Sequence, residues 1–533
     1  MTSVPAAARD FRTHPFLLAI LGFVFLGVTP WDGAASALPA SAQPPDLLAS
    51  ELPHPPTSEL PDPLASHLEE RIPRVMARHG VEGVNILVLR EGREVWAASF
   101  GFADPAQDLP MSRGAVFRVE SISKPVTAWG VMSLVEEGRI GLNDLVADHL
   151  HSWSPPPDLG EVTVRHLLSQ TGGLAIGDFT DRFPPDGPVR PLRESISRDL
   201  EMVAAPGERF HYSNVGFNLL EVLVEDATAQ PFSRWMADAV LRPLGMDTAT
   251  FEWAPELEPR MPVGHDLNGQ AVEPHVYPGR ASGGLLASVD DLARFAAASM
   301  DPPFGLEPSP GLELPLGPGP LPLTPETRAE LHRPQVAVEG IFRFVADGYA
   351  LGYFTETLSD GRRAVWHGGQ GNGWMTHIHL VPESGDGVVI LANSQRAWPL
   401  FGHILRAWSE SLGVEPVGMS VITRASTLAW AVTLLLGLVT GAQALRLIRQ
   451  PVRPALGHRV AAGGAGVILL AGVGWAAVQD YLFLFSILPG QVGWLGAATG
   501  TFGAVLLLSA LVRPDPTGRH GVAQLDETSS PPQ

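Results

Sequence analysis

The pattern of apolar and polar residues changes several times along the chain, and these changes divide it into segments. Residues 16–28 form an unbroken apolar run that follows Arg9 and Arg12 and precedes two groups of small residues. A basic start, a short apolar run and small residues are typical of a secretory signal peptide. The pattern therefore predicts a signal peptide over residues 1–37, or an N-terminal anchor if this segment is not cleaved.

The next segments indicate a linker followed by one folded domain. Residues 38–64 are rich in Pro, Ser and Ala and have no periodicity, which is typical of a linker. From 65 to 413 the pattern is globular and begins with a hairpin of two strands. The predicted strands are 84–89, 94–100, 364–367, 375–381 and 387–392, and the predicted helices are 121–137, 165–174, 214–228 and 288–299. Early strands, a helical middle and late strands indicate an α+β fold whose sheet contains both ends of the domain.

Three mostly apolar segments within 425–512 are predicted to be transmembrane helices. Each is about 20 residues long, which is sufficient to cross a bilayer. They are residues 425–445, 460–479 and 491–512. The connection 446–459 contains four Arg, whereas the connection 480–490 contains none. The positive-inside rule therefore predicts that 446–459 and the tail 513–533 are cytoplasmic and that the globular domain lies on the outer side of the cell membrane.

Composition restricts the classes of partner. The sequence has 56 acidic and 36 basic residues, a net charge of −20, and the acidic excess lies between residues 31 and 417. Nucleic acid is therefore not expected as the main partner, because phosphate binding requires a basic face. The absence of Cys excludes disulfides, thiolate metal sites and a cysteine nucleophile.

Lys124 is the single lysine of the chain, in which every other basic residue is Arg. Lysine can lose its proton when it is buried, whereas arginine stays charged, so a lone lysine indicates a site that arginine cannot fill. Chance in an Arg-biased composition is the alternative. Ser121 precedes Lys124 by three positions at the start of the predicted helix 121–137, so both lie on one face. A Ser hydroxyl becomes a nucleophile beside a base, and burial and the helix N-terminus lower the pKa of a Lys.

Two later motifs contain residue types that serve such a nucleophile. Tyr212 beside a Lys can carry a proton, and the amide of Asn214 can hold a substrate carbonyl, although an ordinary helix start with an Asn cap is the alternative. Glycines at a strand end let the backbone approach a ligand, and an exposed N–H there can form half of an oxyanion hole, with a glycine-rich turn as the alternative. The residues of this second motif are His367, Gly368, Gly369 and Gln370.

The order Ser-x-x-Lys, Tyr-x-Asn, His-Gly-Gly resembles that of the serine β-lactamase-like family, which contains class C β-lactamases and penicillin-binding-protein-type serine hydrolases. The resemblance covers about residues 70–412. It includes VESISKPVTAWGVMSLVEEGRIGLNDLVADHL, VTVRHLLSQTGGL, PGERFHYSNVGFNLLEVLVEDATAQPF, ASGGLLASVDDLARF and WHGGQGNGWMTHIHLVPESGDGVVILANS. It implies a β-lactamase-like α+β fold, with an antiparallel sheet, a helical subdomain and the active site between them.

The same resemblance implies roles for the residues of the three motifs. Ser121 is the acylated nucleophile, Lys124 and Tyr212 share the general-base and general-acid work, and Asn214 orients Lys124 and the substrate amide. The backbone N–H groups of Ser121 and Gln370 form the oxyanion hole. His367 replaces the Lys of the Lys-Thr-Gly motif that helps to bind the carboxylate of penicillins. A histidine is mostly neutral at pH 7, so efficient β-lactam hydrolysis is not expected.

Other polar residues receive structural interpretations. His377 and His379 share one face of a predicted strand and are interpreted as solvent-facing histidines rather than metal ligands. Asp290 and Asp291 are expected to cap the helix that follows them.

The resulting hypothesis is an exported, membrane-anchored serine hydrolase that acts on a small-molecule or peptide ester or amide through an acyl-enzyme, without metal or organic cofactor. Esterase, D-amino-acid peptidase, carboxypeptidase and β-lactamase activities all remain open, as does the oligomeric state. The first alternative is a penicillin-recognising membrane sensor or binding module with little turnover, because fold resemblance alone does not establish function. The second is a transporter with an accessory outer domain, which is disfavoured because the spans carry few ionisable groups.

Overall fold

The computed structural model describes residues 62–178, 181–300, 322–449, 455–477 and 483–511. The predicted signal peptide, nearly all of the predicted linker and the tail 513–533 lie outside these residues. The chain divides into two compact units, one that ends at Ala425 and one that contains the helices from Ser426 onward. Each unit is described by itself.

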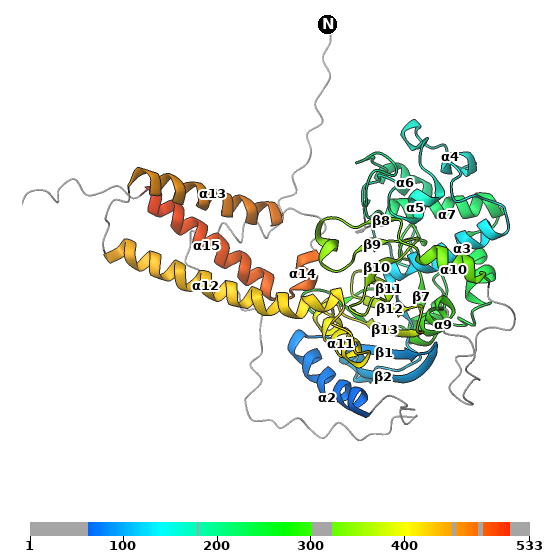
Figure 1. The fold of residues 1–533 in the computed structure, drawn as a ribbon, viewed down its shortest axis with the longest axis horizontal. Helices are drawn as coiled ribbons and strands as arrows, with labels where there is room; N and C mark the ends of the chain where they lie inside the picture. Colours follow the sequence, from blue (N-terminus) through cyan, green and yellow to red (C-terminus); the bar gives the residue numbers. More distant parts are fainter. Residues whose placement is uncertain (1–61, 179–180, 301–321, 450–454, 478–482, 512–533) are drawn as a thin grey trace, which may run out of the picture. The chain divides into compact units, whose positions relative to one another are not determined.

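The first unit is built on a nine-stranded antiparallel sheet with the order β3-β2-β1-β13-β12-β11-β10-β9-β8 (Figure 1). Its strands are β1 Gly83–Arg90, β2 Arg93–Asp104, β3 Leu109–Pro110, β8 Val336–Ala337, β9 Gly348–Tyr349, β10 Phe354–Thr357, β11 Arg363–Gln370, β12 Met375–Val381 and β13 Asp386–Ala392. β1 pairs with β13, with Val84 opposite Ala392. Both ends of the domain therefore meet in the middle of the sheet, which confirms the predicted fold class.

The first hairpin forms as the sequence indicates. Glu91 and Gly92 connect β1 to β2 with φ values of 52° and 75°. Two consecutive left-handed residues form the turn whose twist matches that of antiparallel strands, and Gly adopts this conformation without steric cost.

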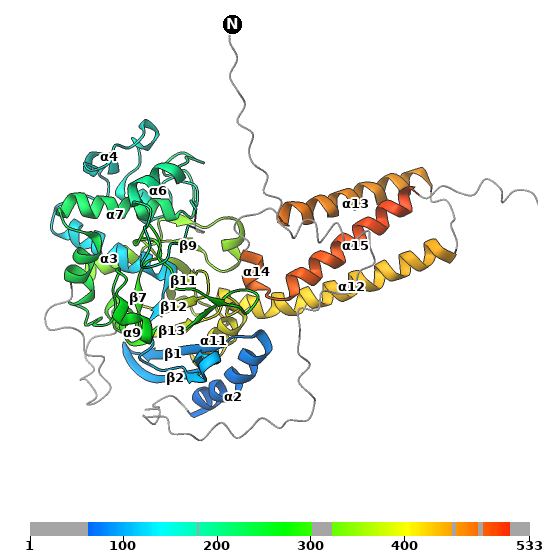
Figure 2. The same cartoon turned by 180° about the vertical axis from the view of Figure 1, so that it is seen from behind.

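Helices cover both faces of the sheet, and β12 and β13 are buried along their whole length. Helices α2, Asp62–His79, and α11, Trp398–Ser411, pack against each other on one face (Figure 2). Helix α9, Val289–Ser299, packs against β1 and β13. Ser288 is the N-cap of α9 and Asp291 completes the capping box, whereas Asp290 forms an ion pair with Arg113. Of the two predicted capping residues, Asp291 alone has that role.

The remaining helices form the subdomain at one end of the sheet. They are α3 Ser123–Glu136, α4 Val146–His149, α5 Val164–Leu168, α6 Leu192–Asp199, α7 Asn214–Thr228, α8 Phe232–Met236 and α10 Pro325–His332. The predicted helix 214–228 has the bounds of α7. The predicted helix 165–174 ends at Leu168, because Gln170 adopts a left-handed φ of 58° and two glycines follow it.

The second unit contains three long apolar helices, which run from Val421 to Arg449 (α12), Leu456 to Ala477 (α13) and Gln491 to Leu511 (α15), and the short α14, Phe483–Ile487. All three long helices have the length and composition to cross a membrane. Helices α13 and α15 pack closely, and a Cβ built on Gly466 would lie 2.6 Å from the carbonyl oxygen of Gly503. Small residues at such contacts let two membrane helices approach each other.

Candidate active site

Ser121 and Lys124 lie where a short 3-10 turn, η2 Glu120–Ile122, continues into α3. The prediction of one helix from residue 121 is wrong in detail, because Glu120 has a φ of 52° and the α-helical pattern begins at Ser123. The geometric consequence is nevertheless the predicted one. The Nζ atom of Lys124 lies 3.1 Å from the Oγ atom of Ser121.

The Lys124 ammonium has three oxygen acceptors around it. Besides Ser121 Oγ, it donates to the Oδ1 atom of Asn214 at 2.8 Å and to the carbonyl oxygen of Ser282 at 2.7 Å. A carbonyl and an amide oxygen only accept, so they fix two N–H bonds of the amine in place. When Lys124 is neutral, its lone pair therefore faces the hydroxyl of Ser121.

Burial of the Lys124 side chain favours this neutral form. The residue is fully buried, and its removal from water lowers the pKa of the amine well below the ordinary lysine range. The charge of the nearby Glu120 carboxylate opposes this shift and raises the pKa of Lys124. Glu120 is itself buried, and Arg118 forms an ion pair with it, with 3.3 Å between Nε and Oε1.

Tyr212 and Asn214 are positioned by the start of α7. Ser213 is the N-cap, and its Oγ accepts a hydrogen bond from Gly216 N at 3.1 Å. Asn214 is thus the first helical residue rather than the cap, which leaves its amide available to Lys124. The ring centroid of Tyr212 lies 4.9 Å from Lys124 Nζ.

Gln170 holds this segment in place and was not identified from the sequence. Its side-chain oxygen accepts from Ser213 N at 2.7 Å, and its side-chain nitrogen donates to Ser213 O at 3.2 Å. Both backbone groups between Tyr212 and Asn214 are therefore paired with one buried amide. A single polar residue after a short helix carries no sequence signal for this role.

The loop that supplies the Ser282 carbonyl is held by a second buried group that the sequence analysis did not single out. The Glu221 carboxylate accepts from Arg280 N at 2.5 Å and Ala281 N at 2.8 Å, and burial raises its pKa to about 7. On the other side, Ser123 Oγ accepts from Leu285 N at 2.9 Å. These contacts place the loop against α3 and bring Ser282 to Lys124.

Strand β11 forms the opposite wall, and the second predicted motif lies within this strand rather than in a turn. A Cβ built on Gly369 would lie 2.3 Å from the carbonyl oxygen of Val119. Thr376, on the next strand, donates to that same oxygen at 2.7 Å. The close approach requires Gly at this position and brings β11 against the segment that leads to Ser121. The Gln370 side chain accepts from Trp398 Nε1 at 3.0 Å.

His367 is buried on this wall among aromatic rings. Its Nδ1 atom lies 2.9 Å from Gly368 O, and its Nε2 atom lies 3.3 Å from the hydroxyl of Tyr349. Because a carbonyl only accepts, Nδ1 carries the proton and Tyr349 donates to Nε2. Burial lowers the pKa of His367 to about 3, and the charge of Lys124 acts in the same direction. A neutral His367 cannot provide the positive charge of a Lys at this position.

Aromatic rings connect the two walls. The ring of Tyr212 stacks on Phe342 and Phe354, with centroids 5.9 and 6.3 Å apart, and Phe354 stacks on Trp366 at 4.5 Å. Tyr212 is half-buried, whereas Trp366 is in the core.

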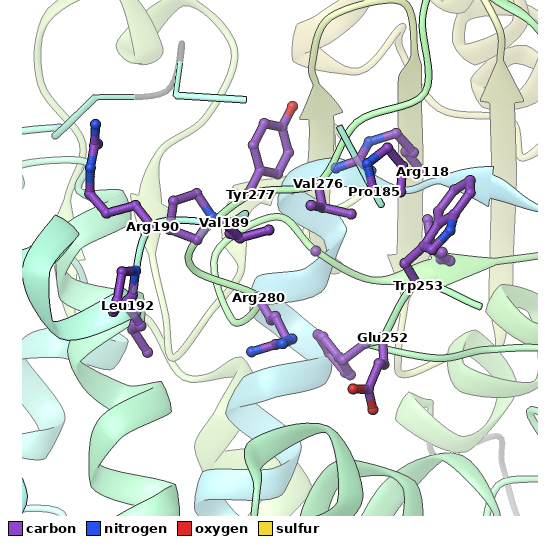
Figure 3. A pocket seen from close by; sticks show the side chains of 15 residues that line it. Arg118, Pro185, Val189, Arg190, Leu192, Glu252, Trp253, Val276, Tyr277 and Arg280 are labelled. Atoms are coloured by element: carbon purple, nitrogen blue, oxygen red, sulfur yellow. The ribbon is translucent and has the colours of Figure 1, made fainter. Parts of the chain in front are cut away.

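A cavity of about 370 Å³ lies next to this site, between the segments 185–192, 251–253 and 276–286 (Figure 3). Arg118 and Tyr277 line it and also contact the Glu120 carboxylate beside Ser121. Its arginines already face carboxylates: Arg118 pairs with Glu120, Arg190 with Asp181 and Arg280 with Glu221. The cavity is therefore not an evident site for an additional anion.

The interpretation of His377 and His379 as solvent-facing is wrong. Both are fully buried, because α11 covers this face of β12 and Trp408 packs on His379. His379 Nε2 lies 3.1 Å from Glu356 Oε1. Among the described residues, no group of three His, Cys, Asp or Glu side chains could hold a metal ion.

Sequence comparison assigns the class. The Beta-lactamase family model matches residues 68–407, which is more than half of the chain. The chain therefore belongs to the Beta-lactamase family, a family of serine hydrolases, as the order of its three motifs predicted.

The chain is similar to an esterase, to a protein named flp and to a penicillin-binding protein homologue. Esterase EstB from Burkholderia gladioli is 27% identical over 381 residues, which cover 62% of this chain and 91% of the esterase. Protein flp from Staphylococcus aureus strain MW2 is 25% identical over 324 residues, which cover 59% of this chain, and the match spans 60% of the length of that relative. The octameric penicillin-binding protein homologue from Pyrococcus abyssi has a TM-score of 0.56 and 27% identity, over 66% of this chain and 78% of that chain.

Proposed function

We propose that the protein is a membrane-anchored serine hydrolase whose Ser121 is acylated by an ester or amide on the outer side of the membrane. The observation that carries the proposal is the fully buried Lys124, the single lysine of the chain, with Nζ at 3.1 Å from Ser121 Oγ. A buried amine with a lowered pKa next to a serine hydroxyl is an activated nucleophile–base pair.

The reaction proceeds in two halves. Neutral Lys124 accepts the Ser121 proton as Oγ bonds to the substrate carbonyl carbon, and the backbone N–H groups of Ser121 and Gln370 stabilise the resulting oxyanion. The bond to the leaving group then breaks, and the leaving group takes a proton that Tyr212 relays from Lys124. A water molecule attacks the acyl ester through the same groups, which releases the acid and returns the proton to Ser121.

The environment of His367 favours substrates without a carboxylate next to the scissile bond. A neutral imidazole that is hydrogen-bonded to Tyr349 and Gly368 offers no positive charge to such a group. An ester without a carboxylate requires none. The relative named as an esterase, EstB, agrees with this preference.

Export and anchoring are supported by the distribution of charge. Three described helices have the length and composition of membrane spans. The four arginines of residues 446–459, where the first span ends and the second begins, favour a cytoplasmic position for this part of the chain. A thiol reagent that does not cross membranes tests the orientation in intact cells, because the chain has no Cys. It should label Leu109→Cys in the outer domain and leave His520→Cys in the tail unlabelled, and the reverse result contradicts the proposed topology.

The catalytic proposal is tested with the full chain in detergent, by measuring hydrolysis of a short acyl ester and of a chromogenic penicillin. Ser121→Ala should abolish turnover, whereas Ser133→Ala, which changes a buried serine of the same helix, should retain it. Ester turnover should greatly exceed penicillin turnover. Ester hydrolysis that survives Ser121→Ala contradicts the proposal, and acylation by penicillin with little turnover of either substrate favours the sensor alternative.

A further inference from the structure

A short turn next to the active site exposes two large apolar side chains. The 3-10 turn η6, Gly340–Phe344, lies between β8 and β9 and exposes 74% of Phe344 and 39% of Ile341. Isolated exposed apolar residues are common, but two large ones within one turn form a patch that water solvates poorly. Between them, Phe342 turns inward and stacks on Tyr212 and Phe354. The same short turn therefore contributes to the aromatic wall of the active site and to the surface.

Contacts within the first unit hold η6 against the segment that leads into α12. A Cβ built on Gly418 would lie 2.5 Å from the carbonyl oxygen of Val345, the residue after η6. The Gly418 N–H donates to the Glu356 carboxylate at 2.8 Å. Ile422 is buried, which anchors the first turn of α12 to the domain. In Figures 1 and 2 the yellow-green segment between β8 and β9 and the yellow start of α12 emerge on the same side of the domain.

Chain length then limits the distance between η6 and the bilayer. The apolar part of α12 begins near Ala425, seven residues after Gly418. A helix rises 1.5 Å per residue, so Gly418 can lie at most about 10 Å from the hydrocarbon layer, a distance comparable with the thickness of the headgroup region. Phe344 directly precedes Val345, which contacts Gly418, and Ile341 belongs to the same turn, so both are carried close to the start of α12. Arg343 and Arg424 are also exposed at this end of the domain and suit lipid phosphates.

We propose that η6 is a membrane-contact element that inserts Ile341 and Phe344 into the outer lipid interface and presents the Ser121 site to substrates whose apolar part lies in the bilayer. The occupant of the apolar patch is thus the lipid surface, to which the same chain is attached through α12. Burial of two large apolar side chains in the interface offsets the cost of exposing them to water. Because Phe342 belongs to the same turn, lipid contact and the aromatic wall around Tyr212 are mechanically connected.

Lipid contact is tested directly by site-specific fluorescence of the full chain in nanodiscs. The chain has no Cys, so Phe344→Cys can be labelled at one position with an environment-sensitive fluorophore. Leu109→Cys is the matched control, because Leu109 is 49% exposed on β3, at the edge of the sheet opposite β8. Lipids with a nitroxide near the headgroup should quench the label at 344 about twofold or more and leave the label at 109 unchanged. Equal quenching at both positions, or no quenching at 344, overturns the proposal, including the case in which another part of the protein covers η6.

The consequence for substrates rests on the proposed hydrolase function and is tested separately. Ile341→Ser combined with Phe344→Ser should lower kcat/KM about tenfold for a long-chain ester embedded in the nanodisc, and change it less than about twofold for a water-soluble short ester. Leu109→Ser should change neither value. An equal loss on both esters indicates damage to the site and contradicts the proposed surface role. If neither ester is hydrolysed by the wild type, the hydrolase proposal fails, and the quenching result still decides the membrane contact.

Discussion

Two buried basic side chains face each other across the candidate active site, and their surroundings differ. Lys124, on the helical wall, is surrounded by three oxygen atoms and lies close to the Glu120 carboxylate. His367, on the strand wall, lies among aromatic rings and has one hydroxyl and one carbonyl as partners. Burial lowers the pKa of both.

This comparison shows that burial removes charge but does not by itself create a catalytic base. Lys124 has the nucleophile within hydrogen-bond distance, and two fixed acceptors direct its lone pair toward Ser121. Both ring nitrogens of His367 already have partners, the hydroxyl of Tyr349 and the carbonyl of Gly368. The helical wall is therefore expected to perform the chemistry, and the strand wall is expected to shape the site and to select against anionic groups.

The largest expected effect comes from removal of the base on the helical wall. Lys124→Met preserves the length of the side chain and removes the amine, and it should lower kcat/KM for an ester by about 10³-fold or more. Lys124→Arg should be nearly as damaging, because arginine does not accept a proton at neutral pH. Steady-state hydrolysis provides the measurement, and near-wild-type activity of Lys124→Arg would show that Lys124 acts as a charge and not as a base.

A smaller effect is expected from the residue that positions Tyr212 and Asn214. Gln170→Leu leaves the buried N–H of Ser213 without its partner, which should cost about 1–3 kcal/mol of stability, whereas the Ser213 carbonyl keeps its bond within α7. The kcat for a short ester should fall about 10- to 100-fold in the fraction that remains folded, because the proton-carrying groups are displaced. Thermal unfolding and active-site titration separate the two effects. Unchanged kcat per folded molecule would show that Gln170 supports stability alone.

The charge near Lys124 provides a test with a defined sign. Activity requires neutral Lys124, so kcat/KM should rise with pH through the pKa of this group. The Glu120 carboxylate raises that pKa, so Glu120→Gln should move the acid limb of the profile to lower pH. The groups that face this pair are Arg118, Tyr277, His367 and Tyr212, and none of them is changed in the variant. An acid limb that stays in place or moves upward contradicts the assignment of Lys124 as the base.

The smallest effect on activity is expected on the strand wall. His367→Asn should change ester kcat/KM by only a few-fold and leave the shape of the pH profile unchanged above pH 5, because the pKa of His367 is about 3. Its effect on stability is larger. Below about pH 6.5 the unfolded chain binds a proton at this histidine, whereas the folded chain does not. The free energy of unfolding of the wild type is therefore undiminished by His367 above that pH and decreases as the pH falls below it.

The difference in the pKa of His367 between the folded and unfolded chain sets the expected change in stability with pH. The wild type should lose about 2 kcal/mol more than His367→Asn between pH 7 and pH 5, because the histidine contributes about 1.4 kcal/mol per pH unit in this window. Unfolding monitored by tryptophan fluorescence at both pH values gives the difference. Parallel pH dependence of the two proteins would show that His367 is charged in the folded state.

Several elements of the fold could be predicted from local patterns in the sequence. Local patterns predicted α7 and β12 with the bounds that the structure has, and β13 within one residue. Apolar residues at helical spacing indicate a helix, and short apolar runs between turn residues indicate buried strands. The motif order also identified the family. The turn at Ser121 was missed, because the left-handed conformation of Glu120 depends on its buried contacts with Arg118 and Tyr277.

Contacts between distant segments account for the other differences. His377 and His379 alternate as surface residues would, but α11 covers their face of the sheet. Gln170 and Ser282 reach the site from separate loops, and each is a single polar residue in an unremarkable local sequence. No local pattern distinguishes such residues from ordinary loop residues. The roles of the eight predicted site residues stay predictions until variants are measured.

The central claim is that Lys124 activates Ser121 to form a covalent acyl-enzyme, and intact-mass spectrometry of the full chain tests it most directly. The protein is mixed briefly with an activated ester, acid-quenched and digested to locate the adduct. The account predicts one acyl group on the peptide that contains Ser121, formed at least about 10³-fold more slowly in Lys124→Met and absent in Ser121→Ala. An adduct on another residue, or hydrolysis without any adduct at Ser121 under conditions that trap acyl-enzymes, would contradict it.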